Sequence, residues 1–499
     1  MAKVAILIGS ESDREVMKDS VKYLDFFGIE SDLRVLSAHR NADKAVTFVK
    51  NASGNGFSLI IAGAGMAAHL PGVAAAHTQL PVLGVPLDAS PLNGVDALYS
   101  MVQMPPGIPV GTVAIGKAGA RNAAVLAARI IALNDSGVLQ KLEESGAVLT
   151  AKLAMVELAG GMGYRQPNAS ITGPGINPWN KDAWSGGSSS GSGSSVAAGL
   201  VPFAIGSETF GSILSPAGNC GVAGLRPTYG RVSRYGAMAL SWTLDKLGPL
   251  CLTADDCGLV LNTIAGYDPN DPSTTKRPYQ YEASDLPGQR FRLGVIKGVA
   301  DGADEEVQAN FRESLRVLGQ VASIDEVEML EGFPSGEVTR TILNAEAASA
   351  FEDFLETGRA SELTAPEDRY GGYARMSLLA TDYIRALRLR GLMAREADRV
   401  MSRYDVLVAP SRATVASALD EEFRSVAGGG APDVMGAVGN GAGLPAISVP
   451  NGFGARGLPT GIQFMGRVYE ENKVLAVARA YQSLTDWHQR HPPEALPKN

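Results

Sequence analysis

Short apolar runs alternate with helical patterns through the first 135 residues, and this alternation restricts the possible folds more than any other feature. The runs are VAILIG, LRVLS, FSLIIAGAG, PVLGVPL and PVGTVAIG. Strands separated by helices pair in parallel through right-handed crossovers, and the helices then cover both faces of the sheet. The sequence therefore predicts a flavodoxin-like three-layer α/β/α domain with a parallel sheet, which we place at residues 1–140.

Polar side chains interrupt this pattern where three of the expected strands end. Because the carboxyl ends of parallel strands meet at one edge of the sheet, we expect these side chains to line one pocket. Hydroxyls and a guanidinium suit the charge of a phosphate monoester, and two histidines can transfer protons near neutral pH. The residues are Ser10, Ser12 and Asp13 after the first strand, Ser37, His39 and Arg40 after the second, and Gly65 and His69 after the third.

Each of these residues also has a purely structural explanation. Ser12 stands at a strand-to-helix junction, where serine is typical of a helix N-cap. The glycine-rich loop could be a tight turn, and His69 could orient its neighbours only. The convergence of three loops favours a functional pocket, because caps alone do not require His39 and Arg40 to be adjacent at a strand end.

The motifs GSESD, SAHR, GAGMAAHLPG, LPVLGVP and SMVQMPPGIPVGTVAIG resemble those of class I 5-(carboxyamino)imidazole ribonucleotide mutases, the catalytic subunit of phosphoribosylaminoimidazole carboxylase. The resemblance covers about residues 3–135. It implies interconversion of 5-(carboxyamino)imidazole ribonucleotide and 5-amino-1-(5-phosphoribosyl)imidazole-4-carboxylate in purine biosynthesis. It also implies a small ribonucleotide substrate, no biotin, metal or nucleotide cofactor, and a homo-oligomer, an octamer in the family. The related direct carboxylase, which uses free carbon dioxide and aminoimidazole ribonucleotide, remains an alternative.

The same resemblance implies a role for each residue of the pocket. His39 would be the general acid/base that serves decarboxylation and removes the ring proton. His69 and the backbone around Gly65 would line the carbon dioxide site. One departure from the family is Asn41-Ala42, where Thr-Pro is usual. The residues that would hold the ribose phosphate are Ser10, Asp13, Ser37 and Arg40, with Ser12 beside them.

The junction between the two halves contains no spacer rich in proline or serine. Helix-forming residues run on through LQKLEESGAVLTAK, residues 139–152, and this predicts a continuous helix or a tight join. Beyond it, glycine, proline and serine become frequent, and long helices are expected near residues 383–404 and 470–485. We place a second domain at residues 145–495.

The stretch WSGGSSSGSGSS, residues 184–195, has the composition of a flexible linker. A linker should stand between completed domains, yet this stretch leads directly into a dense apolar segment that contains a second Gly-Ser corner, FGS. Two such loops can present hydroxyls and backbone N–H groups to a reacting carbonyl. We therefore expect a packed catalytic corner here instead of a tether.

These residues resemble the amidase signature family, which hydrolyses amides with a Ser, cis-Ser, Lys triad. The resemblance runs from about residue 145 to residue 492 and implies an α/β domain with a mixed sheet, here lacking its N-terminal segment. It makes Ser212 the nucleophile and Ser188 the bridging serine. The backbone N–H groups of Thr209, Phe210, Gly211 and Ser212 would form the oxyanion hole.

The family's catalytic lysine lies in a segment that the first domain replaces here. Lys152 matches a different family position, and Lys117 belongs to the first domain. Without a base, Ser212 should stay a weak nucleophile, so we expect an impaired module with an exposed sheet edge. One alternative is an amide hydrolase whose lysine comes from another residue or subunit, with the first domain as an oligomeric scaffold. Another is that neither half turns over.

Composition limits the classes of partner that we expect for this chain. Apolar residues make up 45% of the chain and charged residues 19%, and the net charge of -8 includes no basic block, so nucleic acid is not an expected partner. No apolar run is long enough for a signal peptide or a membrane span. The three cysteines lack metal-ligand spacing and are expected to be reduced core residues of a cytoplasmic protein.

Overall fold

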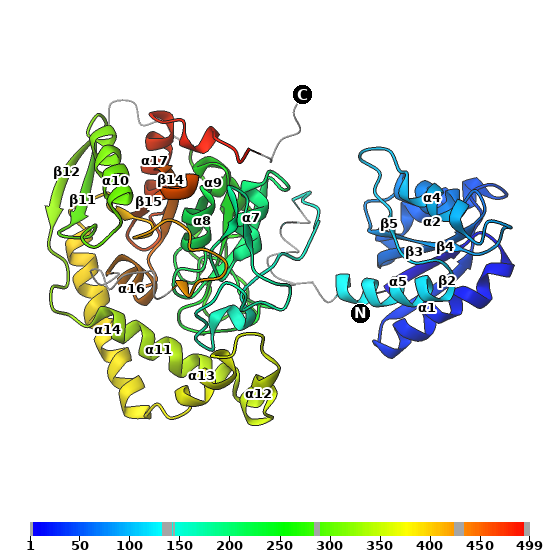
Figure 1. The fold of residues 1–499 in the computed structure, drawn as a ribbon, viewed down its shortest axis with the longest axis horizontal. Helices are drawn as coiled ribbons and strands as arrows, with labels where there is room; N and C mark the ends of the chain where they lie inside the picture. The colour runs from blue at the N-terminus through cyan, green and yellow to red at the C-terminus, as the bar shows by residue number, and fades with distance from the viewer. Residues whose placement is uncertain (1–2, 132–141, 143–144, 284–289, 424–433, 494–499) are drawn as a thin grey trace. The chain divides into compact units, whose positions relative to one another are not determined.

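The chain forms two units, Met1–Asn134 and Asp135–Asn499, in the computed structural model (Figure 1). The structure describes residues 3–131, 142, 145–283, 290–423 and 434–493. No helix within these ranges is both long enough and apolar enough to cross a lipid bilayer.

The N-terminal unit contains a parallel sheet with the strand order β2-β1-β3-β4-β5. This confirms the predicted α/β fold with a parallel sheet. The fifth strand is shorter than its apolar run, because Pro109 lacks the amide that a ladder needs and the chain turns into a helix at Gly116. The strands are β1 (Lys3–Ile8), β2 (Glu30–Val35), β3 (Phe57–Gly65), β4 (Val82–Leu87) and β5 (Gly111–Thr112).

Helices cover both faces of this sheet, as the alternation requires (Figure 1). Successive side chains of β1 point to opposite faces, so Ile6 packs with one set of helices and Leu7 with the other. The first face is covered by α1 (Arg14–Phe26) and α5 (Gly116–Ile131), and the second by α2 (Ala42–Asn51), α3 (His69–Ala75) and α4 (Val95–Val102).

Of the two predicted kinds of junction, the continuous helix is wrong where the structure describes it, whereas the tight join stays a prediction. Residues 147–152 are not helical, and Gly146 has a φ of 89°, a left-handed conformation that interrupts a helix. The earlier part of the expected helix, apart from Leu142, lies outside the described residues.

The larger unit is built on an eight-stranded mixed sheet with the order β12-β11-β13-β15-β14-β9-β10-β8. β11 pairs in parallel with β12 and β13, and the remaining pairs are antiparallel, which confirms the mixed sheet. The strands are β8 (Phe203–Glu208), β9 (Ala223–Arg226), β10 (Lys246–Cys251), β11 (Phe291–Ile296), β12 (Ala322–Val327), β13 (Val406–Pro410), β14 (Ala446–Phe453) and β15 (Pro459–Met465).

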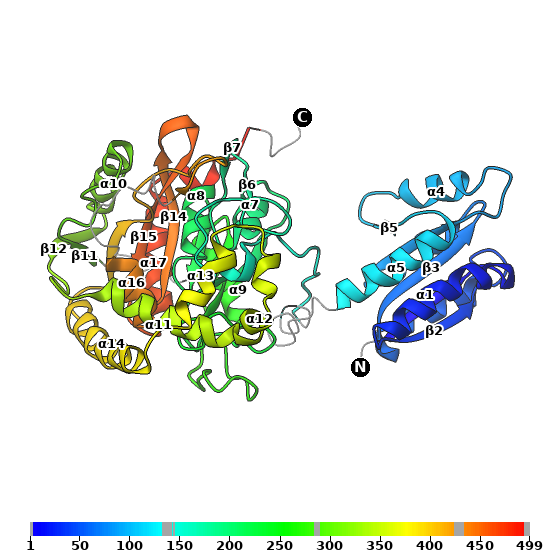
Figure 2. The ribbon, with the colours of Figure 1, turned by 60° about the horizontal axis from the view of Figure 1, so that its bottom comes forward.

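Two groups of helices sandwich this sheet (Figure 2). One face packs against α9 (Ala254–Ile264), α10 (Glu305–Leu318) and α17 (Glu471–Ser483), and the other against α8 (Leu214–Cys220), α14 (Ala380–Met401) and α16 (Val434–Gly441). α14 and α17 lie where long helices were expected. The other helices are α7 (Ser190–Ala197), α11 (Ser335–Ala350), α12 (Glu352–Glu356) and α13 (Asp368–Arg375), and a short ribbon joins β6 (Ile176–Asn177) to β7 (Asn180–Trp184).

A buried ion pair fastens the loop after β9 to the start of α17. Arg231 Nη2 lies 2.9 Å from Glu471 Oε2, and both side chains are almost completely excluded from solvent. Glu471 also accepts a hydrogen bond from the backbone N–H of Thr228 at 3.1 Å. The guanidinium of Arg231 stacks over the ring of Tyr469 at 4.7 Å, so its removal from water is compensated on several sides.

We expect Glu471→Ala to lower the free energy of unfolding of the larger unit by about 3 to 5 kcal/mol, because it leaves the Arg231 charge buried without its partner. Glu313→Ala is the control, since Glu313 pairs with Arg316 at the surface and should contribute less than about 1 kcal/mol. Urea unfolding followed by tryptophan fluorescence measures both. Equal losses in the two variants would contradict this view of the pair.

Candidate functional site

The two histidines of the N-terminal unit meet at the edge where β1, β2 and β3 end. His39 follows β2, and His69 is the first residue of α3, after β3. Their Nε2 and Nδ1 atoms lie 2.7 Å apart, and the rings are nearly perpendicular at 84°. Both residues are exposed, so the pair can reach a molecule bound in front of it. In this contact one ring nitrogen must donate and the other accept.

Arg40 joins this pair from the same turn. Its Nη2 donates to the carbonyl oxygen of Gly9, 2.6 Å away, so the guanidinium lies at the end of β1. The turn itself is shaped by Ser37, a buried residue whose Oγ accepts from the N–H groups of His39 at 3.3 Å and Arg40 at 3.2 Å. Ser37 therefore already has a structural role in presenting the other two side chains.

The loop after β1 brings its hydroxyls to the same edge. Ser12 Oγ donates to Ser10 Oγ at 3.0 Å, and Asp13 Oδ2 accepts from the backbone N–H of Ser10 at 3.0 Å. Asp13 is buried, and this burial raises the pKa of its carboxyl despite the hydrogen bonds from Ser10 and Ser12 and the charge of Arg40. Ser10 and Asp13 form a reciprocal cap, so the structural explanation applies to Asp13 at least as well as to Ser12.

Gly65 ends β3 where β4 and the loop after it approach closely. A Cβ atom at Gly65 would lie 2.5 Å from the Cβ of Ala89 and 3.2 Å from the carbonyl oxygen of Leu87. Any side chain would therefore push the two loops apart. The structure thus gathers at one edge a guanidinium, two serine hydroxyls and an imidazole pair, a set that can bind an anion and move a proton.

In the larger unit, the two predicted catalytic serines lie on neighbouring loops. The backbone N–H of Ser189 donates to the carbonyl oxygen of Ser212 at 3.2 Å. Ser188 is fully buried, follows a cis peptide bond from Gly187, and its carbonyl oxygen accepts from Val156 N–H at 3.0 Å. Ser212 is half-buried and immediately precedes the turn into α8.

Residues 209–212, here called the Ser212 loop, are the predicted oxyanion-hole residues and the nucleophile. Gly211 has a φ of 93°, a conformation that favours glycine at this position. The Thr209 hydroxyl donates to Asp245 Oδ1 at 2.5 Å. Just beyond the loop, Glu208 Oε2 accepts from the N–H groups of Ile213 at 2.9 Å and of the residue after it, Leu214, at 3.0 Å.

No described lysine serves the two serines. The Ser188 hydroxyl is buried and has no hydrogen-bond partner among the residues that the structure describes. Lys152 is exposed on the non-helical segment, and Lys117 lies in α5 of the N-terminal unit. Within the described ranges, no lysine amine is therefore hydrogen-bonded to the Ser188 hydroxyl.

Sequence reasoning missed a set of buried charges behind the Ser212 loop. Glu208 pairs with Arg226, whose Nη1 lies 2.8 Å away, and both are fully buried. Asp245 and Lys246 are buried beside them. A signal was present, because the adjacent charges in TLDKLGPLCL interrupt an otherwise apolar run. Adjacent charges on a strand are usually solvated, so the pattern alone does not indicate burial.

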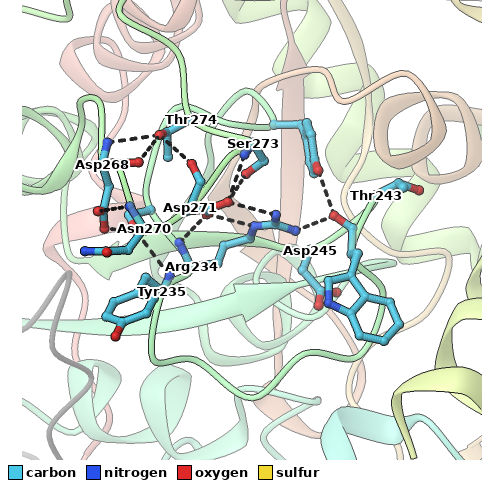
Figure 3. Close-up of polar contacts among 12 residues, drawn as sticks. Arg234, Tyr235, Thr243, Asp245, Asp268, Asn270, Asp271, Ser273 and Thr274 are labelled. Atoms are coloured by element: carbon cyan, nitrogen blue, oxygen red, sulfur yellow. Dashed lines mark hydrogen bonds and ion pairs between the residues drawn. The ribbon is translucent and has the colours of Figure 1, made fainter.

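The turn that carries Asp245 is itself held by ionic contacts. Asp245 Oδ2 accepts from the N–H groups of Leu240 and Ser241 at 2.8 and 2.9 Å. Figure 3 shows Arg234 reaching between Asp271 and this turn; the Arg234 Nη2 to Asp271 Oδ1 distance is 3.2 Å. Burial opposes ionisation of Asp271, but hydrogen bonds from Arg234 and Ser273 outweigh it and lower the pKa of the carboxyl.

β8 is one of the two edge strands of the described sheet, and β12 is the other. Side chains from the glycine- and serine-rich segment partly cover β8. Ser189 Oγ donates to the carbonyl oxygen of Ser207 at 3.2 Å and accepts from its N–H at 3.1 Å. Ser192 Oγ donates to the carbonyl oxygen of Ile205 at 2.9 Å. Hydroxyls thus satisfy backbone groups that another strand would otherwise bind.

Two family models match the chain. The amidase model matches residues 120–475, and the AIR carboxylase model matches residues 3–152. Among curated proteins, the A-subunit of glutamyl-tRNA(Gln) amidotransferase from Geobacillus stearothermophilus is 35% identical over 384 residues, covering 72% of this chain and 78% of that protein. Its counterpart from Roseiflexus castenholzii is 38% identical over 387 residues, covering 72% and 77%.

Solved structures are similar over comparable shares of the chain. The A-subunit of glutamyl-tRNA(Gln) amidotransferase from Thermotoga maritima has a TM-score of 0.60 at 30% identity, covering 70% of this chain and 76% of that one. Native peptide amidase of Stenotrophomonas maltophilia has a TM-score of 0.60 at 29% identity, covering 72% and 78%.

We expect Thr209→Val to lower the free energy of unfolding of the larger unit by about 1.5 to 3 kcal/mol, because it removes a buried hydrogen bond to a carboxylate. Thr263→Val is the control, since the Thr263 hydroxyl bonds only the Leu259 carbonyl oxygen on an exposed face of α9. Urea unfolding of the two variants beside the wild type measures the difference. A Thr209→Val curve that overlays the control would show that the Asp245 contact contributes nothing.

Proposed function

We propose that the N-terminal unit is a 5-(carboxyamino)imidazole ribonucleotide mutase. This chain belongs to the amidase family, and an AIR carboxylase match begins ahead of the amidase match. The larger unit is an amidase-fold module with impaired hydrolysis. The observation that carries the first proposal is the 2.7 Å contact between His39 and His69 beside Arg40. We place the protein in the cytoplasm, acting as a homo-oligomer on a small ribonucleotide.

In the proposed reaction, the ribose phosphate lies against Arg40 and the hydroxyls of Ser10 and Ser12. The guanidinium fork and the hydroxyls supply the several donors that a phosphate monoester needs. Ser37 and Asp13 shape the two turns that present these groups. The positive charge of Arg40 also acts on the carboxyl group of Asp13. The aminoimidazole ring then faces the histidine pair.

His39 acts as the general acid/base. The N–C bond of the carbamate breaks and releases carbon dioxide, and His39 supplies a proton to the exocyclic nitrogen. Carbon dioxide stays beside His69 and the Gly65 backbone until the ring carbon attacks it and forms the new C–C bond. The ring proton returns to His39, so the overall reaction consumes no proton. The hydrogen bond between the two rings holds the His39 ring in position for both transfers.

The larger unit presents Ser212 and Ser188 as an amide hydrolase does, but no described lysine bonds to Ser188. A serine hydroxyl without a base is a weak nucleophile at neutral pH. We therefore assign this unit no efficient turnover of its own. The second candidate function is amide hydrolysis with a lysine supplied by a neighbouring protomer, the N-terminal unit serving as scaffold. This second candidate is favoured by the buried Ser188 hydroxyl, which has no described hydrogen-bond partner and can therefore still bond to a donor or acceptor.

We expect the wild-type protein to convert 5-(carboxyamino)imidazole ribonucleotide, and His39→Asn to slow this by about 10²- to 10⁴-fold, the contribution of a general acid/base. His77→Asn is the control, because His77 is a half-buried histidine of the same unit outside the pair. Product formation is followed by liquid chromatography. An inert wild-type protein, or a fully active His39→Asn variant, would refute the mutase proposal.

A comparison of substrates separates the mutase from the direct carboxylase. The mutase should act on 5-(carboxyamino)imidazole ribonucleotide without added bicarbonate. The carboxylase should instead require aminoimidazole ribonucleotide together with bicarbonate, and its rate should rise with bicarbonate concentration. Rapid turnover only in the second assay would replace the proposed substrate while leaving the histidine pair in its role.

We expect simple amides to be hydrolysed no faster by the wild-type protein than by Ser212→Ala, because Ser188 lacks a base partner in the described chain. Ammonia release from a series of aliphatic and aromatic amides is the measurement. Turnover that disappears in Ser212→Ala would instead support the second candidate function.

A further inference from the structure

Helix α4 carries two polar side chains that reach the loops beside the histidine pair. Ser100 Oγ donates to the carbonyl oxygen of Ala67, 2.5 Å away, in the loop after β3. Asp96 Oδ1 accepts from the hydroxyl of Ser90 at 2.9 Å, in the loop after β4. Residues four apart lie on the same face of a helix, so one face of α4 binds both loops.

Residues 66–68, here called the β3–α3 loop, have a backbone conformation that side chains disfavour. Met66 has a φ of 55° and Ala68 a φ of 42°, both in the left-handed region, where a Cβ atom lies too close to the following carbonyl oxygen. The N–H of Ala68 donates to the carbonyl oxygen of Gly65 at 3.1 Å, which closes a tight turn. His69 follows directly as the first residue of α3, so the direction of its side chain depends on this turn being held.

The Ser100 hydroxyl can hold the turn because α4 is itself fixed. Ala97 and Met101 of α4 are buried in the core of the unit. A serine within a helix commonly bonds the carbonyl four residues earlier in its own helix, whereas Ser100 bonds Ala67. The Ala67 carbonyl belongs to the peptide unit that joins Ala67 to Ala68. Holding its oxygen therefore also restricts the φ of Ala68, one of the two left-handed angles.

We propose that Ser100 is a positioning residue whose hydroxyl holds the β3–α3 loop so that His69 points at His39. Ser100 acts through the Ala67 carbonyl oxygen, which its hydroxyl binds. The catalytic meaning of this contact rests on the proposed mutase reaction, in which the histidine pair serves proton transfer. The effect of Ser100 on the pair itself can be measured without turnover.

In the proposed reaction, loss of this contact should lower kcat and leave KM nearly unchanged. The phosphate donors Ser10, Ser12 and Arg40 lie on the loops after β1 and β2, whereas Ser100 binds the loop after β3. We expect Ser100→Ala to lower kcat about three- to tenfold, the effect of losing one neutral hydrogen bond, with KM changed less than about twofold. Ser100→Thr keeps the hydroxyl and should retain the wild-type kcat.

The imidazole nitrogen signals in nuclear magnetic resonance spectra test the positioning directly. The chain has five histidines, so the rings of His39 and His69 can be assigned in full-length protein that is isotope-labelled at histidine. At about pH 8, where an ordinary histidine ring is neutral, the contact requires one donor and one acceptor nitrogen. We expect Ser100→Ala to move the His69 Nδ1 signal toward its position in His39→Ala, which lacks the partner ring. Ser100→Thr should leave the signal as in the wild type.

Ser20→Ala is the matched control. The Ser20 hydroxyl donates to the carbonyl oxygen of Ala120 at 2.7 Å, between α1 and α5 on the other face of the sheet. This variant removes the same kind of contact from the same unit and leaves the β3–α3 loop intact, so the imidazole signals should not move. Alanine is a better helix former than serine, so Ser100→Ala does not weaken α4 itself.

Unchanged imidazole signals in Ser100→Ala would overturn the proposal, and so would an equal displacement in Ser20→Ala. An unchanged kcat in Ser100→Ala would overturn it as well, where the wild-type protein turns over. An inert wild-type protein would refute the mutase reaction alone, because the imidazole signals still decide whether Ser100 positions His69.

Discussion

The buried carboxylate of Glu208 is the contact on which the proposed catalytic corner of the larger unit depends. Glu208 is the last residue of β8 and forms an ion pair with Arg226. It also accepts hydrogen bonds from the two backbone N–H groups that follow Ser212. An uncompensated charge at such depth would cost several kcal/mol, so these partners are a condition for its burial. The end of strand β8, Arg226 on β9 and the turn from Ser212 into α8 are therefore connected through this side chain.

A different constraint forms the candidate site of the N-terminal unit. Its sheet is parallel, and the loops that follow neighbouring strands must emerge at one edge. The site then needs little further support: Ser37 shapes one turn, Asp13 caps another, and Gly65 lets β3 and the loop after β4 approach. The site is exposed and carries its polar groups on loops, whereas the serines of the larger unit lie within a network of buried charge.

The two units thus differ in how well they are equipped for their proposed chemistry. In the proposed reaction, the histidine pair of the first unit supplies the acid/base, and its arginine and hydroxyls supply the anion site. The second unit retains the loops, the glycine at a positive φ and the bracing carboxylates, while the Ser188 hydroxyl has no described partner. Ser189 and Ser192 cover part of the β8 edge, which explains how a sheet that ends at this strand satisfies its outer backbone groups.

The sequence by itself determined the parallel sheet, the three loops at its edge and the two families, because strand-helix alternation and local motifs are properties of short segments. The helices α14 and α17 were equally accessible from periodicity. It did not determine the junction, where residues 147–152 are not helical although their sequence favours a helix. Only the tertiary structure decided that His39 meets His69, that Asp245 accepts from Thr209, and that Lys246 is buried opposite Glu208. The partners in these contacts are 30 or more residues apart, and no local pattern encodes them, since burial and charge pairing exist only once the strands are packed side by side.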